Sequence, residues 1–271
     1  MAARENLIPS PGAVEALFGR VLVGVDGSAE ALEAARQAAI LVDPDGELAL
    51  VAAWSLAPPL VAPLAVLPPF DGDADRARLQ AETALAEAQK AVSATSAVVV
   101  HGFAPQALLD RIERSHDTLV AAGSHGVGRA AGIFAGSTVT ELVHRAPCSV
   151  LVARGDGRWG PRRILVGVDG SPHSALAHAA ARQLRDRFDG TLSVVVAEGS
   201  EAIDLGAVSL IAGDGFHVIS DDPVAVLTAA AADADLLVLG SRGLRGLKAL
   251  GSVSERVAHR APCSTLIVRG G

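Results

Sequence analysis

Two segments of the 271-residue sequence are nearly identical, and this internal repeat constrains the fold more than any other feature. Residues 20–28 read RVLVGVDGS, and residues 163–171 read RILVGVDGS. A second block, HRAPCS, occurs at residues 144–149 and again at residues 259–264. The two blocks lie closer together in the second half than in the first. Because self-similarity on this scale marks repeated structural units, the chain is predicted to contain two homologous domains of unequal length.

Each half is predicted to alternate short apolar strands with Ala-rich helices. Both halves begin with a strand that ends at Asp-Gly-Ser, followed by a helix at residues 29–42 or 172–188, with Ser28 or Ser171 as its N-cap. The further strands are predicted at residues 48–53, 97–100, 118–122 and 150–153, and at 192–197, 216–219, 236–239 and 265–268. The expected fold class is α/β: two doubly wound Rossmann-like domains, each a five-stranded parallel sheet between helices, with 3-2-1-4-5 as the expected strand order.

The domain boundary is predicted at residues 155–162, which have the Gly, Pro and charge content of a linker. The organisation is then an N-terminal extension (1–19), a first domain (20–154), this linker and a second domain (163–271). The second domain is shorter by roughly what a Pro-rich stretch and a helix at residues 73–92 contribute to the first. We expect that loss to thin one helical layer and to lower the stability of the second domain.

Composition and charge exclude several classes of partner. The formal net charge of −7 and the absence of a long Lys/Arg run leave no basic surface for a nucleic acid. The apolar stretch 56–70 is too rich in proline to span a membrane as a helix, and it is interpreted as a loop, a lid or a docking surface. Cys148 and Cys263 occupy the same place in both repeats and are expected to be small buried residues without a disulfide. A cytoplasmic protein is expected, since no signal peptide is recognised.

A glycine-rich loop follows the fourth predicted strand. In the first half it contains Gly123 and Gly126, then nine residues, then Gly136 and Ser137 at the start of a helix. Such a loop suits an anion cradle, because glycines let backbone N–H groups approach phosphate oxygens and a helix N-terminus adds unpaired donors. It equally suits a plain loop with a helix cap. Asp26, at the end of the first strand, is expected either to contact a ligand in the same crevice or to stabilise its own turn.

These residues resemble the universal stress protein family. ATP-binding members carry Gly-x2-Gly-x9-Gly-(Ser/Thr) in this loop and an Asp after the first strand, and the first half matches both. The Ala-Pro-Cys segment before a final apolar strand is also typical, and the resemblance covers residues 20–155 and 161–269. It implies ATP or a related adenine nucleotide, with Mg²⁺ or Mn²⁺ bridging its phosphates. The ligand-binding residues that it implies in the first half are Asp26, Ala53, Gly123, Gly126, Gly136, Ser137 and Thr138.

The second half departs from this pattern in its loop length. Seven residues separate Gly243 from Gly251, whereas nine separate Gly126 from Gly136, so the geometry of a triphosphate does not carry over. A smaller anion, a monophosphate nucleotide and no ligand all stay open, and Ser252 with Glu255 also fits a capping box that needs no ligand. The candidate residues that persist are Asp169, Gly240, Gly243, Gly251 and Ser252.

The sequence favours a stress-linked regulatory protein over an enzyme. It contains no Walker-type Gly-Lys-Ser and no recognisable nucleophile–base pair, so slow ATP hydrolysis is the most that is expected. His144 and His259, beside arginines at a helix-to-strand corner, are interpreted as C-terminal helix caps. The alternative function is a nucleotide-free scaffold. The resemblance implies that the two domains pair through their last strands, residues 150–153 and 265–268, and a further association of two chains to a homodimer stays open.

Overall fold

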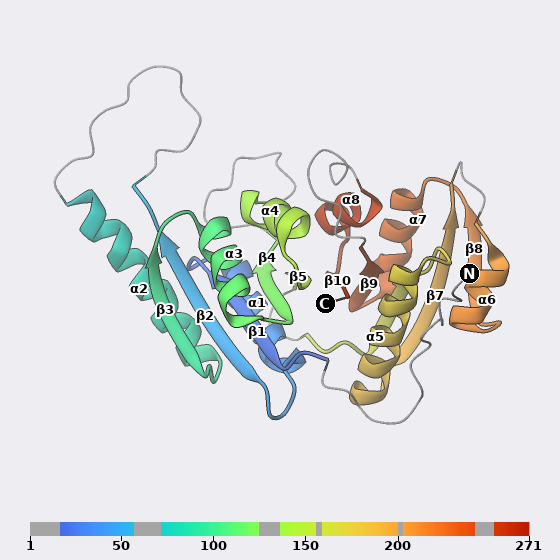
Figure 1. Cartoon of the computed structure of the whole chain (residues 1–271), viewed down its shortest axis with the longest axis horizontal. Coiled ribbons are helices and arrows are strands. Elements are labelled where there is room, and N and C mark those ends of the chain that lie inside the picture. The colour runs from blue at the N-terminus through green and yellow to red at the C-terminus, as the bar shows by residue number, and fades with distance from the viewer. Residues whose placement is uncertain are drawn as a thin grey trace, which may run out of the picture.

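The structure is a computed structural model of the chain, and it describes residues 17–56, 72–124, 136–155, 159–199, 203–241 and 252–270. The ten strands among these residues form one sheet in the order β3-β2-β1-β4-β5-β10-β9-β6-β7-β8 (Figure 1). Each half therefore contributes five parallel strands in the order 3-2-1-4-5, and the predicted fold class is confirmed.

The described elements follow the predicted alternation of strands and helices. The first half contains β1 (Arg20–Val25), α1 (Ala29–Leu41), β2 (Glu47–Trp54), α2 (Asp73–Ala91), β3 (Ser96–His101), α3 (Ala104–Ser115), β4 (Leu119–Gly123), α4 (Ser137–Arg145) and β5 (Ser149–Ala153). The second half contains β6 (Arg163–Gly167), α5 (Pro172–Phe188), β7 (Thr191–Glu198), α6 (Leu205–Ala212), β8 (Phe216–Ser220), α7 (Pro223–Ala230), the 3-10 turn η1 (Ala231–Asp233), β9 (Leu236–Gly240), α8 (Val253–Arg260) and β10 (Ser264–Val268).

Helices cover both faces of the sheet (Figure 1), because the chain crosses to one side of β1 or β6 and then to the other, and right-handed crossovers in opposite directions place their helices on opposite faces. On one face, α1, α2, α5 and α6 share a single cluster of buried apolar side chains that runs from the first half into the second. On the other face, α3 and α4 cover the first half, while α7 and α8 cover the second. The central strands are buried on both faces, which explains why they read as continuous apolar runs in the sequence.

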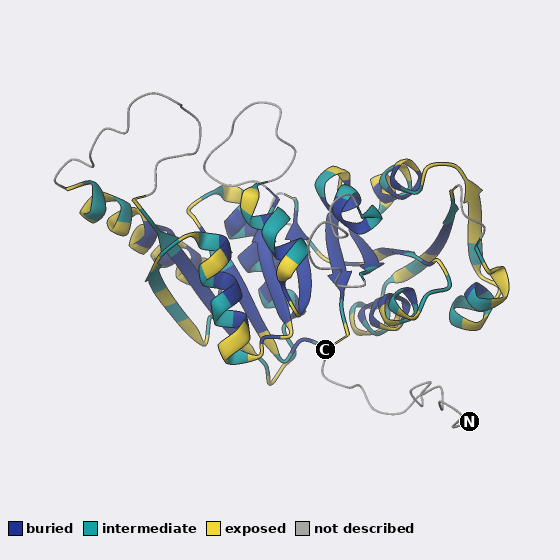
Figure 2. Cartoon of the chain, turned by 45° about the horizontal axis from the view of Figure 1, so that its top comes forward, coloured by how far each residue is buried: buried dark blue, intermediate teal, exposed yellow. Residues whose placement is uncertain are grey.

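The helical layer of the second half is shortened, not lost. Between β7 and β8 lies α6, with eight residues, where the first half has the 19-residue α2. Helix α6 buries only Val208, and its Leu210 is 89% exposed. Figure 2 shows the exposed character of α6 and of the neighbouring edge strand β8. The expectation that the second half lacks this helix is corrected to a helix of two turns.

The two halves meet along β5 and β10, which pair antiparallel with Leu151 opposite Leu266. A buried polar chain accompanies this seam. Ser264 Oγ donates to Gln37 Oε1 over 2.7 Å, and Gln37 Nε2 donates to the carbonyl oxygen of Arg154 over 2.7 Å. Helix α1 of the first half is thereby hydrogen-bonded to the last strand of the second.

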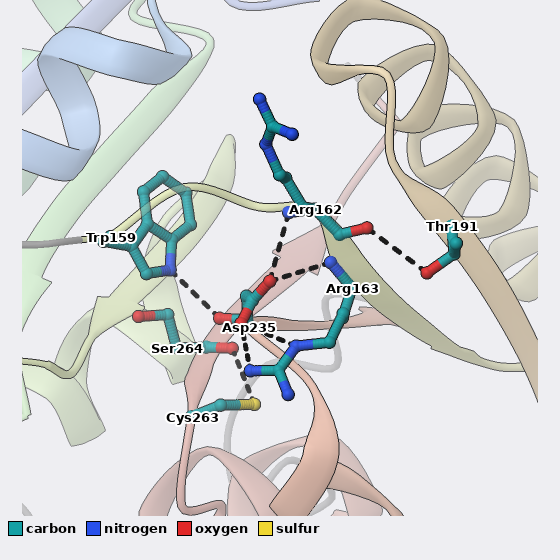
Figure 3. A network of polar contacts seen from close by, with 7 residues as sticks. All are labelled: Trp159, Arg162, Arg163, Thr191, Asp235, Cys263 and Ser264. Atoms are coloured by element: carbon teal, nitrogen blue, oxygen red, sulfur yellow. Dashed lines mark hydrogen bonds and ion pairs between the residues drawn. The ribbon is translucent and has the colours of Figure 1, made fainter.

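The linker is anchored to the second half through Asp235 (Figure 3). Its carboxylate accepts hydrogen bonds from the backbone N–H groups of Arg162 and Arg163 and from the Arg163 guanidinium, at 3.2, 2.8 and 2.6 Å. Trp159 Nε1 donates to the Asp235 carbonyl oxygen at 3.0 Å. Burial opposes ionisation of Asp235, but these bonds and the charge of Arg163 hold the pKa of its carboxyl below the usual value.

The residues just before β1 pack against the core of the first half. Phe18, which was assigned to the N-terminal extension, is 2% exposed and belongs to the main apolar cluster. Its backbone N–H donates to Asp43 Oδ2 over 2.7 Å. Leu17 and Phe18, just before β1, therefore form part of the apolar core of the first half.

Candidate functional site

A crevice of about 380 Å³ lies at the carboxyl ends of β1, β2 and β4, the expected place for a ligand in a doubly wound sheet. The first residues of α4 form its opposite wall. Every candidate of the first half that the structure describes lines this crevice, whereas Gly126 lies outside the described residues. The lining candidates are Asp26, Ala53, Gly123, Gly136, Ser137 and Thr138.

The N-terminus of α4 is the feature of this crevice best suited to an anion. The N-cap is Gly136, with φ −69° and ψ 153°, and it supplies no side-chain cap to the helix. The first N–H groups of a helix have no partner within the helix, and they carry the positive end of its dipole. Ser137 is exposed and Thr138 is half-buried, and both line the crevice at the start of this helix.

Asp26 stabilises the turn between β1 and α1, which is one of the two roles expected for it. Its Oδ1 accepts from the backbone N–H of Ser28 at 3.0 Å and from Ser28 Oγ at 2.6 Å. Ser28 in turn caps α1 by accepting from the backbone N–H of Ala31. Because Asp26 is exposed and also lines the crevice, this turn holds its carboxylate at the mouth of the site.

Gly123 has a packing role that the sequence interpretation did not include. A Cβ atom at this position would lie 2.5 Å from the carbonyl carbon of Glu30, in the first turn of α1. Gly240 repeats this arrangement, with a Cβ only 2.3 Å from the carbonyl oxygen of His173 in α5. In both halves the fourth strand therefore ends against the backbone of the first helix, and only glycine fits there.

The second half contains a larger crevice, of about 1020 Å³, at the equivalent place. Asp169 and Gly240 line it, but Ser252 is not among its lining residues, and Gly243 and Gly251 lie outside the described part of the chain. Ser252 Oγ instead accepts from the backbone N–H of Glu255 and caps α8, which agrees with the capping interpretation.

The walls of this second crevice are acidic. Four carboxylates that the sequence reasoning missed line it together with Asp169, and Arg256 is the one basic side chain among the described lining residues. Two of them, Asp204 and Asp222, cap α6 and α7. Their position before helices was the available signal, because Asp is a favoured N-cap. The four carboxylates are those of Glu198, Asp204, Asp221 and Asp222.

His144 and His259 contact the opposite domain, which differs from their predicted role as helix caps. His144 Nε2 lies 3.0 Å from Glu255 Oε1, and His259 Nε2 lies 3.5 Å from Thr140 Oγ1. Burial, together with the positive charge of Arg154 and with His144, lowers the pKa of His259 despite the opposing charge of Glu255. The helix ends are bound by arginines instead, as described below.

Metal ligands and membrane-spanning helices can be assessed for the described parts of the chain. No group of three or more His, Cys, Asp or Glu side chains there could hold a metal ion. None of the helices described is long and apolar enough to cross a membrane. The two cysteines are free, Cys148 being buried and Cys263 half-buried.

The model of the universal stress protein family matches residues 17–154 and 216–269, which is most of the chain. The chain belongs to the universal stress protein family. Universal stress protein Rv2623 of Mycobacterium tuberculosis is 30% identical, and the match covers 92% of this chain and 96% of that protein. A universal stress protein of Mycolicibacterium smegmatis is 29% identical over the same shares.

Other relatives match only in part. Universal stress protein Rv2005c of Mycobacterium tuberculosis is 33% identical, but the match spans 56% of this chain and 61% of that protein. Among solved structures, a universal stress protein from Archaeoglobus fulgidus superposes with a TM-score of 0.71 at 20% identity, covering 93% of this chain and 96% of that one. This likeness concerns the fold, and it extends over both halves.

Proposed function

We propose that this universal stress protein binds ATP or a related adenine nucleotide in the first-half crevice and acts as a stress-response regulatory protein. The observation that carries the proposal is the N-terminus of α4, whose N-cap residue Gly136 has no side chain to cap it and which lines the same crevice as Asp26 and Ala53. A helix end of this kind binds phosphate through its backbone N–H groups. The resemblance of the loop at Gly123, Gly126, Gly136 and Ser137 to that of ATP-binding family members favours a nucleotide as the phosphate-bearing ligand.

The proposed ligand would lie across the carboxyl ends of the strands. Its phosphates would contact the first turn of α4 at Gly136, Ser137 and Thr138, its ribose would approach Asp26, and its base would lie against the backbone near Ala53. Asp26 is the one ionisable side chain among the described residues of this lining. A Mg²⁺ or Mn²⁺ ion would therefore be held mainly by phosphate oxygens. We propose that the protein binds this nucleotide and hydrolyses it slowly at most. We also propose that it acts in the cytoplasm.

We propose a different part for the second half. Five carboxylates and one arginine line its crevice among the described residues, so a triphosphate there would meet like charges. The second half would then support the first domain instead of binding ATP with equal affinity. Equal occupancy of both halves in a titration with ATP would contradict this division.

A nucleotide-free scaffold is the second candidate function. The observation that favours it is the apolar, exposed surface of α6 beside the edge strand β8, where Leu210 and Ile219 are 89% and 43% exposed. Edge strands of this kind are available for pairing with another chain, such as a second copy. A protein that carries no nucleotide and associates through this edge would support the scaffold.

The proposal can be tested by placing a negative charge at the start of α4. Ser137→Glu adds a carboxylate at the exposed first position of the helix, where the dipole favours it by about 0.3–1 kcal/mol. The same carboxylate would repel the phosphates, so ATP affinity should fall by at least about tenfold, or ~1.4 kcal/mol, while the melting temperature is kept. Ser137→Gln is the uncharged control of equal size and should bind within about threefold of the wild type.

A second experiment on the same three proteins identifies the bound nucleotide. The wild-type protein is denatured after purification, and released nucleotides are separated by chromatography. We expect an adenine nucleotide from the wild type and from Ser137→Gln, and little from Ser137→Glu. No nucleotide from the wild type, together with no binding of added ATP, would refute the proposed function.

A further inference from the structure

Helix α4 carries the proposed nucleotide site at its first residues and is bound by the second domain at its last. Arg269, which directly follows β10, donates from its two terminal guanidinium nitrogens to the backbone carbonyl oxygens of Val143 and Ala146. The carbonyl groups of the last helical turn have no partner within the helix and form its negative end. A guanidinium of the second domain therefore caps a helix of the first.

The reciprocal contact is made by Arg154, the residue after β5. Its guanidinium donates to the carbonyl oxygen of Ala258, in the last turn of α8, over 2.6 Å, and to that of Cys263, directly before β10, over 3.5 Å. Each domain thus supplies one arginine that binds the C-terminal end of a helix in the other domain. Burial lowers the pKa of both guanidinium groups, although arginine stays protonated in proteins.

Further contacts bind α4 to the second domain along its length. Thr140 and His144, one turn apart on α4, lie beside His259 and Glu255 of α8, at 3.5 and 3.0 Å. The two helices are neighbours in the centre of the molecule (Figure 1). The apolar cluster under α4 also contains Ile267 of the second domain. The helix is held from both domains.

We propose, on the basis of the proposed function, that the second domain sets the nucleotide affinity of the first by positioning α4, and that Arg269 is the positioning residue. Helix α4 has nine residues and is about 13 Å long, which is too short to bend appreciably. A displacement of its C-terminus therefore moves the N–H donors at its N-terminus. Because hydrogen bonds weaken steeply with distance and angle, small shifts lower phosphate affinity.

This coupling is reciprocal. If docking of the second domain raises nucleotide affinity, then bound nucleotide must stabilise the docked arrangement by the same free energy. The domain without the matching glycine loop would then regulate the domain that has it. The contact residues on the first-domain side, Thr140 and His144, belong to the same helix as Ser137 and Thr138 of the site.

The test compares Arg269→Met with Arg154→Met. Both variants remove one interdomain guanidinium, but only Arg269 holds α4, whereas Arg154 holds α8. Calorimetric titration with ATP should show a loss of affinity of about five- to tenfold for Arg269→Met and less than about twofold for Arg154→Met. Arg269→Lys keeps a cationic donor at this place and should recover most of the affinity.

A second measurement uses the nucleotide-free protein. Hydrogen exchange followed by mass spectrometry should show faster exchange across α4 in Arg269→Met, and no such change there in Arg154→Met. Wild-type ATP affinity in Arg269→Met with unchanged exchange in α4 would overturn the positioning role and leave the proposed function standing. An equal loss of affinity in both variants would overturn the assignment to Arg269. Absence of ATP binding in the wild type would refute the proposed function and the coupling with it.

Discussion

Substitution of Gly123 by alanine tests whether the first glycine of the loop is required for packing. The added Cβ would lie 2.5 Å from the carbonyl carbon of Glu30 and 2.7 Å from the backbone nitrogen of Ala31. Both contacts are to the backbone of α1, so no side chain can rotate away. The end of β4 or the first turn of α1 must move instead.

The expected cost is that of an overpacked core. Adding a methyl group where the surroundings cannot yield costs about 1–3 kcal/mol. For a domain of this size, a loss of ~2 kcal/mol lowers the melting temperature by about 4–8 °C. The free energy of unfolding is measured by urea denaturation, and the melting temperature by calorimetry, both without nucleotide.

Gly19→Ala is the matched control. No heavy atom lies within 4 Å of a Cβ built at Gly19, so this alanine should leave the stability unchanged or raise it slightly. Gly240→Ala should repeat the loss in the second domain, because its Cβ would lie 2.3 Å from the carbonyl oxygen of His173. Unchanged stability of Gly123→Ala, or an equal loss in Gly19→Ala, would refute the packing role.

Three further outcomes follow from charges and burial. Because the pKa of His259 is lowered in the folded state, the unfolded chain binds more protons below about pH 6.5, so stability should fall between pH 7 and pH 5; an unfolding series in which His259→Gln keeps the full pH dependence would contradict this. Burial raises the pKa of Cys148 to about 12 and of Cys263 to about 11, so iodoacetamide at pH 8 should label both thiols much more slowly in the native protein than after unfolding, and the buried Cys148 most slowly; equally rapid labelling of the native protein would be the opposite result. Asp235→Asn should lower stability by about 1–2 kcal/mol in urea, since it removes the ion pair with Arg163, and a neutral effect would argue against the linker anchor.

The strands could be predicted from the sequence to within one residue at each end. Parallel strands buried on both faces read as continuous apolar runs between turn residues, and the repeat supplied each half with a second copy of the pattern. Helix α6 was not predicted, because the shorter second half was interpreted as lacking the helix at this position. Its eight residues are almost uniformly apolar and show no helical periodicity that would distinguish them from a strand.

The candidate site could be predicted only where it depends on local sequence. Gly136 and Ser137 mark the start of α4 because glycine followed by a hydroxyl residue is a local signal. The packing role of Gly123 depends on α1, whose contacting residue Glu30 is remote in sequence. Arg269 and Arg154 reach carbonyl groups more than a hundred residues away, across the domain seam. No local sequence pattern encodes such contacts, so the binding of these two arginines to helices of the opposite domain could be recognised only in the folded structure.

The most direct test of the central claim is a calorimetric titration of ATP into protein from which nucleotide has been stripped. We predict a single saturating site per chain in the wild type. In Ser137→Glu that site should be weakened by at least about tenfold, in a protein that melts no earlier than the wild type. Undiminished affinity in Ser137→Glu would contradict the placement of the phosphates at α4, and no binding in the wild type would contradict the claim itself.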